Sequence, residues 1–135
     1  FRLVKDSEGL EELAAQIDGQ GMLYLDCETT GLDPRKNRVR LLSLATGAQT
    51  WIVDCFAVDP VALWPALSGC TIVAHNAYFD LGFLARLGLS PSAVCDTMLL
   101  ARLLAAGTKE SCKLADVAKR ELGLHMFVWP WKPAP

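Results

Sequence analysis

Paired cysteines and long apolar runs are missing from this sequence, and each absence excludes a class of protein. The 135 residues include five scattered cysteines and no C-x-x-C pair, which argues against both a disulfide framework and a zinc site. We therefore expect free thiols in a reducing compartment. No apolar run approaches the length of a membrane span, and no charged-then-apolar leader opens the chain. These absences predict a cytoplasmic protein without a membrane partner.

An excess of positive charge is also missing. The net charge is −2, so a nucleic-acid partner would have to be attracted by local basic patches or by bound metal cations. A hydrophobic content of 52% with 21% charged residues predicts a folded chain, long enough for one domain. The chain begins at Phe1 without a methionine and ends in the aperiodic FVWPWKPAP. Both ends predict a piece of a longer protein.

Apolar periodicity and turn residues predict an α/β fold. Strands are expected at residues 21–27, 38–46, 50–56 and 70–75, and helices at 7–18, 60–67, 77–87, 96–106 and around 114–122. Short gaps make the first three strands an antiparallel meander, and the fourth strand, apolar on both faces, is expected to be central. The prediction is a mixed sheet of three antiparallel strands plus a parallel fourth, flanked by helices.

Two carboxylates stand at the end of the first strand, in YLDCETTGL. Asp26 and Glu28 are two residues apart, so their side chains point to the same face of a strand. Two unpaired acids on an apolar sheet would repel each other and resist burial. A divalent cation with a preference for oxygen ligands, Mg²⁺ or Mn²⁺, would resolve this conflict.

A second cluster lies in VAHNAYFDLGFL, where the fourth strand gives way to a helix. Asn76 is predicted to be the N-cap of that helix, and Asp80 lies in its first turns. If the fourth strand lies beside the first, the carboxylate of Asp80 can reach Asp26 and Glu28. Three acids meeting at the end of a central sheet are typical of a two-metal phosphoryl hydrolase. Taken alone, Asp26 and Glu28 would more simply be the solvated end of a strand, with acids that cap the next turn. Asp80 alone could be an acid at a helix start that is favoured by the helix dipole.

With these residues in view, the sequence resembles the DEDD superfamily of 3′–5′ exonucleases. LDCETTGL and HNAYFDLGFL look like its first two motifs, and CDTMLLARLL and SCKLADVAKRELGL extend the resemblance over about residues 1–124. The greatest likeness is to the proofreading exonuclease domain of family A DNA polymerases. The resemblance implies a ribonuclease H-like fold with strand order 3-2-1-4-5. It also implies hydrolysis of the 3′-terminal phosphodiester of DNA, with release of nucleoside 5′-monophosphates.

The resemblance also implies roles for individual residues. Asp26, Glu28 and Asp80 would be catalytic and would hold two divalent metal ions, Mg²⁺ or Mn²⁺. The single-stranded or frayed 3′ end would be bound by the residues that surround them: Leu32 as a wedge against the terminal base, Asn76 and Phe79 as positioning residues, and Thr29 and Thr30 through their backbone amides. Leu32 could equally be a core residue, and Phe79 is expected to be partly core. A polymerase region would belong to the full-length protein.

One departure from the family's pattern leaves the function open. The family's third motif, Tyr-x-x-x-Asp or His-x-x-x-x-Asp, supplies a fourth acid, and no Asp or Glu follows Glu121 here. We therefore divide the chain into a C-terminally incomplete exonuclease domain, residues 1–124, and an atypical tail, residues 125–135. The alternatives are an inactive nucleic-acid-binding domain of the same fold, or a ribonuclease D-type exonuclease acting on RNA. The basic residues between 35 and 40 could contact a nucleic-acid backbone or simply be a solvated surface.

Overall fold

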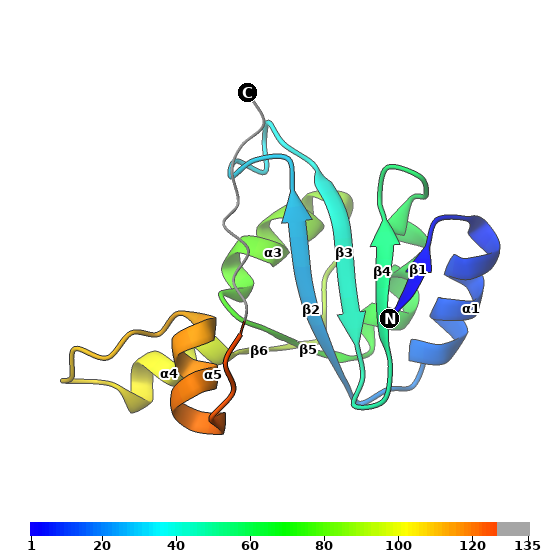
Figure 1. The fold of residues 1–135 in the computed structure, drawn as a ribbon. Coiled ribbons are helices and arrows are strands. Elements are labelled where there is room, and N and C mark those ends of the chain that lie inside the picture. Colours follow the sequence, from blue (N-terminus) through cyan, green and yellow to red (C-terminus); the bar gives the residue numbers. More distant parts are fainter. Residues whose placement is uncertain (127–135) are drawn as a thin grey trace. The chain divides into compact units, whose positions relative to one another are not determined.

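The computed structural model describes residues 1–126, and Figure 1 shows them as a ribbon. The chain forms two compact units, residues 1–96 and the residues from Thr97 onward. The first unit contains, in order, β1 (Arg2–Val4), α1 (Ser7–Ile17), β2 (Met22–Thr29), β3 (Val39–Ala45), β4 (Thr50–Asp54), the 3₁₀ helix η1 (Pro60–Leu63), α2 (Trp64–Ser68), β5 (Thr71–Ala74), α3 (Ala77–Leu84), the 3₁₀ helix η2 (Ala85–Leu87) and β6 (Ala93–Asp96). Of the predicted tail, residues 125–135, all but the first two residues lie outside the described part of the chain.

The first unit is built on one six-stranded sheet with the order β1-β4-β3-β2-β5-β6. β2, β3 and β4 pair antiparallel, whereas β5 pairs parallel with β2 and β6 pairs parallel with β5. The predicted meander and the parallel fourth strand are therefore confirmed. β5 is central, as its apolar faces predicted, because β6 covers its second edge.

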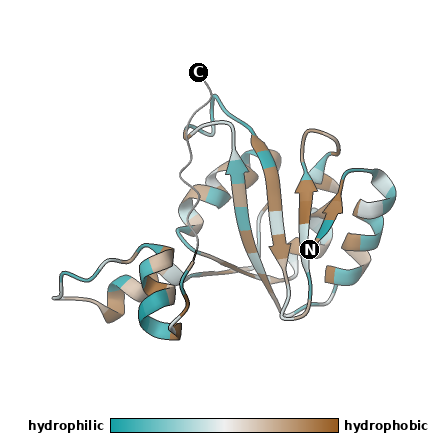
Figure 2. Cartoon of the chain, viewed as in Figure 1, coloured by the Kyte–Doolittle hydropathy of each residue, from teal (hydrophilic) through white to brown (hydrophobic). Residues whose placement is uncertain are grey.

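The hydrophobic core lies on one face of this sheet. In β2 the buried side chains alternate with exposed ones, so Leu23, Leu25 and Cys27 face the core while Asp26 and Glu28 face away from it. Helix α1 contributes a stripe at helical spacing, Leu10, Leu13 and Ile17, to the same core. Figure 2 shows this pattern as alternating hydrophobic and hydrophilic segments along α1. The alternation in β2 fixes which face its acids occupy.

As far as Met126, the second unit contains two helices, α4 (Thr97–Leu104) and α5 (Leu114–Leu122). α5 ends at Gly123, whose φ of 67° lies in the left-handed region that favours glycine. The N–H groups of Gly123 and Leu124 donate to the carbonyls of Lys119 and Ala118, which satisfies two otherwise unpaired carbonyls at the end of the helix. Nowhere in residues 1–126 is a helix long and apolar enough to span a membrane.

The structure adds two short strands that the sequence patterns did not predict. β1 pairs parallel with β4 at one edge of the sheet, and β6 pairs with β5 at the other. Both are short, three and four residues, and neither shows a clear period-two alternation. The predicted helix over 60–67 is split into η1 and α2, with Pro65 in the first turn of α2, where its missing N–H costs nothing.

Candidate active site

The carboxylates of Asp26 and Glu28 lie on the exposed face of β2, at its C-terminal end. Asp26 pairs in register with Ser43 and Glu28 with Leu41 on β3, and the register shifts between Glu28 and Thr29. Such an irregularity bends a strand and changes the direction of the side chains next to it. The two acids thus share one face, as predicted, directly before the strand leaves regular pairing.

Asp80 brings a third carboxylate to this end of β2. Its side chain is 3% exposed, and it is the one charged side chain that is buried within residues 1–126. Its Oδ1 accepts a hydrogen bond of 2.9 Å from the backbone N–H of Cys27, the residue between Asp26 and Glu28. This hydrogen bond connects the first turn of α3 to the backbone of β2 at Cys27, in the first motif.

Burial and charge perturb the titration of these acids. The pKa of Asp80 is raised to about 6, mainly by desolvation and also by the negative charge of Asp26, while the hydrogen bond from the Cys27 N–H lowers it. Desolvation also raises the pKa of Asp26. The pKa of the Cys27 thiol is raised by burial first and then by the charges of Asp80 and Asp26. The negative charge of Asp26 thus opposes the ionisation of Asp80, and both carboxylates are desolvated, which is typical of functional sites.

A different acid holds the N-terminus of α3. Both oxygens of Asp96 accept backbone N–H groups there, from Asn76 at 3.1 Å and from Ala77 at 3.0 Å. Asn76 occupies the predicted N-cap position, but its side chain makes no capping hydrogen bond. Its φ of 71° places it in the left-handed region, the one such non-glycine residue in residues 1–126. The prediction that the Asn76 side chain is an ordinary N-cap was therefore wrong, since Asp96 performs that task from β6.

The turn after the acids is tied together by its threonines. The hydroxyl of Thr29 donates to the carbonyl of Gly31 at 2.7 Å. The Thr30 N–H donates to the carbonyl of Arg38, and the Thr30 hydroxyl accepts the Arg38 N–H at 3.0 Å. The Thr30 amide is thus already used within the turn. Leu32 follows with 84% of its surface exposed, so its interpretation as a core residue was wrong.

Leu32 and Phe79 lie on the wall of one cavity of about 720 Å³. Phe79 is partly buried, as expected, and its ring lies 5.2 Å from that of Phe83. The cavity is lined by Leu32, Asp33, Pro34, Arg35, Tyr78, Phe79, Gly82, Phe83 and Arg86. Two residues predicted to contact a terminal nucleotide therefore share one cavity.

Sequence reasoning missed two residues of this cavity, Tyr78 and Arg86. Tyr78 is 89% exposed, although it is a large aromatic side chain. Phe79, Phe83 and Arg86 follow each other at intervals of four and three residues, which places them on one side of a helix. That spacing is a signal in the sequence that could have found Arg86.

The donors present suit a hard divalent cation by their chemical type. All three are carboxylates, and the repulsion between Asp26 and Asp80 is what a cation would relieve. Within residues 1–126, however, no three His, Cys, Asp or Glu side chains are already gathered into a group that could hold a metal ion. The three carboxylates therefore fit a hard divalent cation by their chemistry, although their side chains are not arranged around one common point.

Comparison with known proteins identifies the family. Residues 1–128 match the family model described as 3′–5′ exonuclease. The chain belongs to this exonuclease family. It is also 35% identical over 105 residues to DNA polymerase I of Aquifex aeolicus (strain VF5), a match that covers 77% of this chain and 17% of the polymerase. The chain therefore spans about a sixth of that relative's length. The sequence-based prediction of a 3′–5′ exonuclease domain that is similar to a DNA polymerase is confirmed.

Solved structures share the fold at low sequence identity. RNase D of Escherichia coli, an exoribonuclease involved in structured RNA processing, superposes with a TM-score of 0.79 at 21% identity, covering 94% of this chain and 34% of that one. The catalytic core of RRP6 from Trypanosoma brucei superposes with a TM-score of 0.81 at 22% identity, covering 99% of this chain and 39% of that one. These likenesses confirm the ribonuclease H-like architecture of the exonuclease domain.

Proposed function

We propose that this domain hydrolyses the 3′-terminal phosphodiester of DNA and releases nucleoside 5′-monophosphates, as the proofreading domain of a DNA polymerase. The observation that carries the proposal is the hydrogen bond from the Cys27 N–H to Asp80. It joins the backbone of the first motif to the acid of the second motif, 53 residues further along the chain, at the end of one central strand. The matched relative is a DNA polymerase, which favours DNA as the substrate.

Asp26, Glu28 and Asp80 are the proposed catalytic residues and metal ligands. Two Mg²⁺ or Mn²⁺ ions, when bound, would supply the charge that activates water and stabilises the leaving oxygen. The contribution of the chain itself is to hold three carboxylates near β2 and to keep Asp80 buried, where water does not weaken its interactions. Metal binding would also favour the ionised form of Asp80, against the raised pKa of the apo protein.

The cavity beside the acids is the proposed site of the terminal nucleotide. Leu32 projects into solvent at the end of the turn, in a position to wedge against the last base, and Phe79 lies on the same cavity wall. Thr29 and Thr30 shape the turn, and Asn76 offers a side chain that is not used for capping. We assign these five residues to substrate binding, with Thr30 acting through the turn it holds and not through its amide.

The test is digestion of a 5′-labelled single-stranded DNA by the 135-residue chain, with Mn²⁺ and with EDTA. Asp26→Asn and Asp80→Asn remove a charge from each motif with little change of shape. Glu11→Gln makes the same kind of change on the exposed face of α1 and serves as the matched control. We expect a metal-dependent ladder that shortens from the 3′ end, present with Glu11→Gln and reduced at least about 100-fold in both site variants.

Other outcomes select the alternatives. No ladder from folded protein that still binds the oligonucleotide would contradict an active nuclease and support an inactive binding domain, as the missing third motif allows. A ladder on RNA but not on DNA of the same sequence would support a ribonuclease D-type activity, because a contact to the 2′-hydroxyl distinguishes the two.

A further inference from the structure

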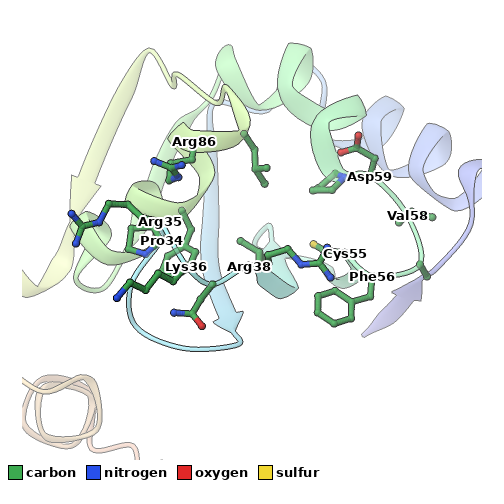
Figure 3. A pocket seen from close by; sticks show the side chains of 15 residues that line it. Pro34, Arg35, Lys36, Arg38, Cys55, Phe56, Val58, Asp59 and Arg86 are labelled. Atoms are coloured by element: carbon green, nitrogen blue, oxygen red, sulfur yellow. The ribbon is translucent and has the colours of Figure 1, made fainter.

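A second cavity continues from the one that contains Leu32 and Phe79. It has a volume of about 620 Å³ and shares Pro34, Arg35, Phe83 and Arg86 with the first. Figure 3 shows its lining: Arg35, Lys36 and Arg38 come from the turn that follows β2, Arg86 comes from η2, and Phe56 comes from the segment after β4. All of these residues belong to the first compact unit. The two cavities together form one depression, which we call the basic groove.

The basic groove is positive in a chain that is negative overall. Four cations line it, Arg35, Lys36, Arg38 and Arg86, against two acids, Asp33 and Asp59, which leaves two positive charges in excess. The whole chain has a net charge of −2. A chain with a negative net charge needs such a local positive patch to attract a polyanion such as a nucleic acid.

Some of these charges are already engaged and others are available. Arg35 forms an ion pair with Asp33 at 3.1 Å. Asp59 accepts the N–H of Val61 at 3.0 Å and so caps η1. Within the described residues, Lys36 and Arg38 form no ion pair. The free positive charge of the groove is therefore concentrated on the turn after β2 and on Arg86.

Arg38 is held in place by an aromatic ring. Its guanidinium lies 4.8 Å from the centre of the Phe56 ring, and the guanidinium of Arg40 lies 4.7 Å from the same ring. Arg40 is neutralised by an ion pair with Asp54, and Asp54 also accepts the Phe56 N–H at 2.9 Å. Phe56 nevertheless remains 50% exposed. The cluster thus presents an exposed guanidinium, that of Arg38, which is stabilised by the Phe56 ring and forms no ion pair within the described residues.

We propose that the basic groove binds the sugar–phosphate backbone of the single strand that lies 5′ to the terminal nucleotide. Guanidinium groups match the geometry of phosphate oxygens, so the guanidinium of Arg38 and the ammonium of Lys36, which form no ion pair in residues 1–126, can bind successive phosphates of a strand. The groove begins at the cavity proposed for the last nucleotide, so a strand bound there has only its 5′ portion to place in the groove. The direction of the strand rests on the proposed function, because it assumes that the first cavity holds the 3′-terminal nucleotide.

The experiment measures binding without hydrolysis. Fluorescence anisotropy in EDTA follows a 5′-labelled oligothymidylate of about 12 nucleotides and one of about three, at several salt concentrations. Lys36→Gln/Arg38→Gln removes two charges from the part of the groove that does not line the first cavity. Arg2→Gln/Lys5→Gln removes one arginine, which is paired with Glu12, and one lysine near β1, and it is the control for the loss of two positive charges outside the groove. Thermal unfolding confirms that each variant is folded.

We expect the groove variant to bind the longer oligonucleotide roughly tenfold more weakly, with a salt dependence whose slope is smaller by about 1.4, the value for two lost contacts to a single strand. Binding of the short oligonucleotide should be unchanged, and Arg38→Lys, which keeps the charge, should retain most of the affinity. Equal affinity of the groove variant and the unaltered chain for the longer strand would overturn the proposal. An equal loss in the control variant would overturn it too.

The groove and the nuclease can fail independently. If the chain hydrolyses neither DNA nor RNA but the groove variant loses length-dependent binding, the proposed nuclease function is wrong and the groove stands. If a metal-dependent ladder forms and the groove variant binds and digests long strands like the unaltered chain, the nuclease stands and the groove proposal is wrong.

Discussion

The Oδ1 of Asp80 accepts the backbone N–H of Cys27 at 2.9 Å, and this hydrogen bond places a buried carboxylate against the strand that carries Asp26 and Glu28. A buried acid near another acid is unfavourable for folding when both are ionised. The raised pKa of Asp80, about 6, is the measure of that cost. Stability and the proposed chemistry are therefore opposed at this residue.

Asp80→Asn should separate the effect of Asp80 on stability from its effect on catalysis. The amide oxygen can still accept the Cys27 N–H, while the buried charge is gone, so above pH 6 the metal-free variant should be more stable than the unaltered chain by on the order of 1 kcal/mol. Exonuclease activity should fall by at least about 100-fold. Urea unfolding in EDTA measures the first effect and the digestion assay the second.

The pH dependence has a definite sign. The folded-state pKa of Asp80 is raised above its ordinary value of 3.8 to about 6, so its contribution to stability is fully present below about 3.8 and is lost as the pH rises through about 6. The free energy of unfolding of Asp80→Asn should lack this decline. If the free energies of unfolding of the variant and of the unaltered chain changed with pH in the same way, Asp80 would not titrate as expected.

Asp96→Ala should loosen the N-terminus of α3. Two backbone N–H groups, of Asn76 and Ala77, would lose their acceptor, and loss of a helix cap costs about 1–2 kcal/mol. Because Asp80 lies in the first turn of this helix, activity should fall as well. Asp96→Asn keeps one acceptor oxygen and should have an intermediate effect. If chemical denaturation gave both variants the same free energy of unfolding as the unaltered chain, the capping role of Asp96 would be wrong.

Much of the fold was predictable because the long elements carry strong periodic signals. The alternation in β2 and the apolar faces of β5 determine the centre of the sheet, and the stripe of α1 determines the face it covers. The patterns of β1 and β6 did not predict them, because strands of three and four residues are fixed by the edges they pair with. The family resemblance did imply a fifth strand beside the fourth, and β6 occupies that place beside β5.

The catalytic role of Asp26, Glu28 and Asp80 stays a prediction, but the neighbourhood of their elements was predictable. The structure confirms that β5 pairs parallel with β2, and Asp80, on the helix after β5, bonds to the backbone of β2. The hydrogen bonds from Asn76 and Ala77 to Asp96 join residues 19 and 20 positions apart, and a local capping rule cannot detect such a pair. The same limit concealed Phe56, which meets Arg38 and Arg40 only through the pairing of β3 with β4.

Gly31→Ala tests the turn that carries Leu32. A Cβ at this position would lie 2.5 Å from Oδ1 of Asn37, so the side chain of Asn37 would have to move and its hydrogen bond to the carbonyl of Asp33 would be strained. We expect a loss of about 1–3 kcal/mol in unfolding free energy. Asn37→Ala removes the obstacle, so adding Gly31→Ala to that variant should cost much less. Additive effects in this double-mutant cycle would contradict the clash.

Asn76 offers a way to separate backbone conformation from substrate contact. Its φ of 71° is accessible to glycine without strain but costs a residue such as alanine about 1 kcal/mol. Asn76→Gly should therefore unfold at nearly the same urea concentration as the unaltered chain, whereas Asn76→Ala should unfold earlier. Since the Asn76 side chain makes no capping hydrogen bond, its proposed work is on the substrate, and both variants should digest DNA more slowly. A glycine variant with undiminished activity would show that the side chain does not contact the nucleotide and that the left-handed backbone is its whole contribution.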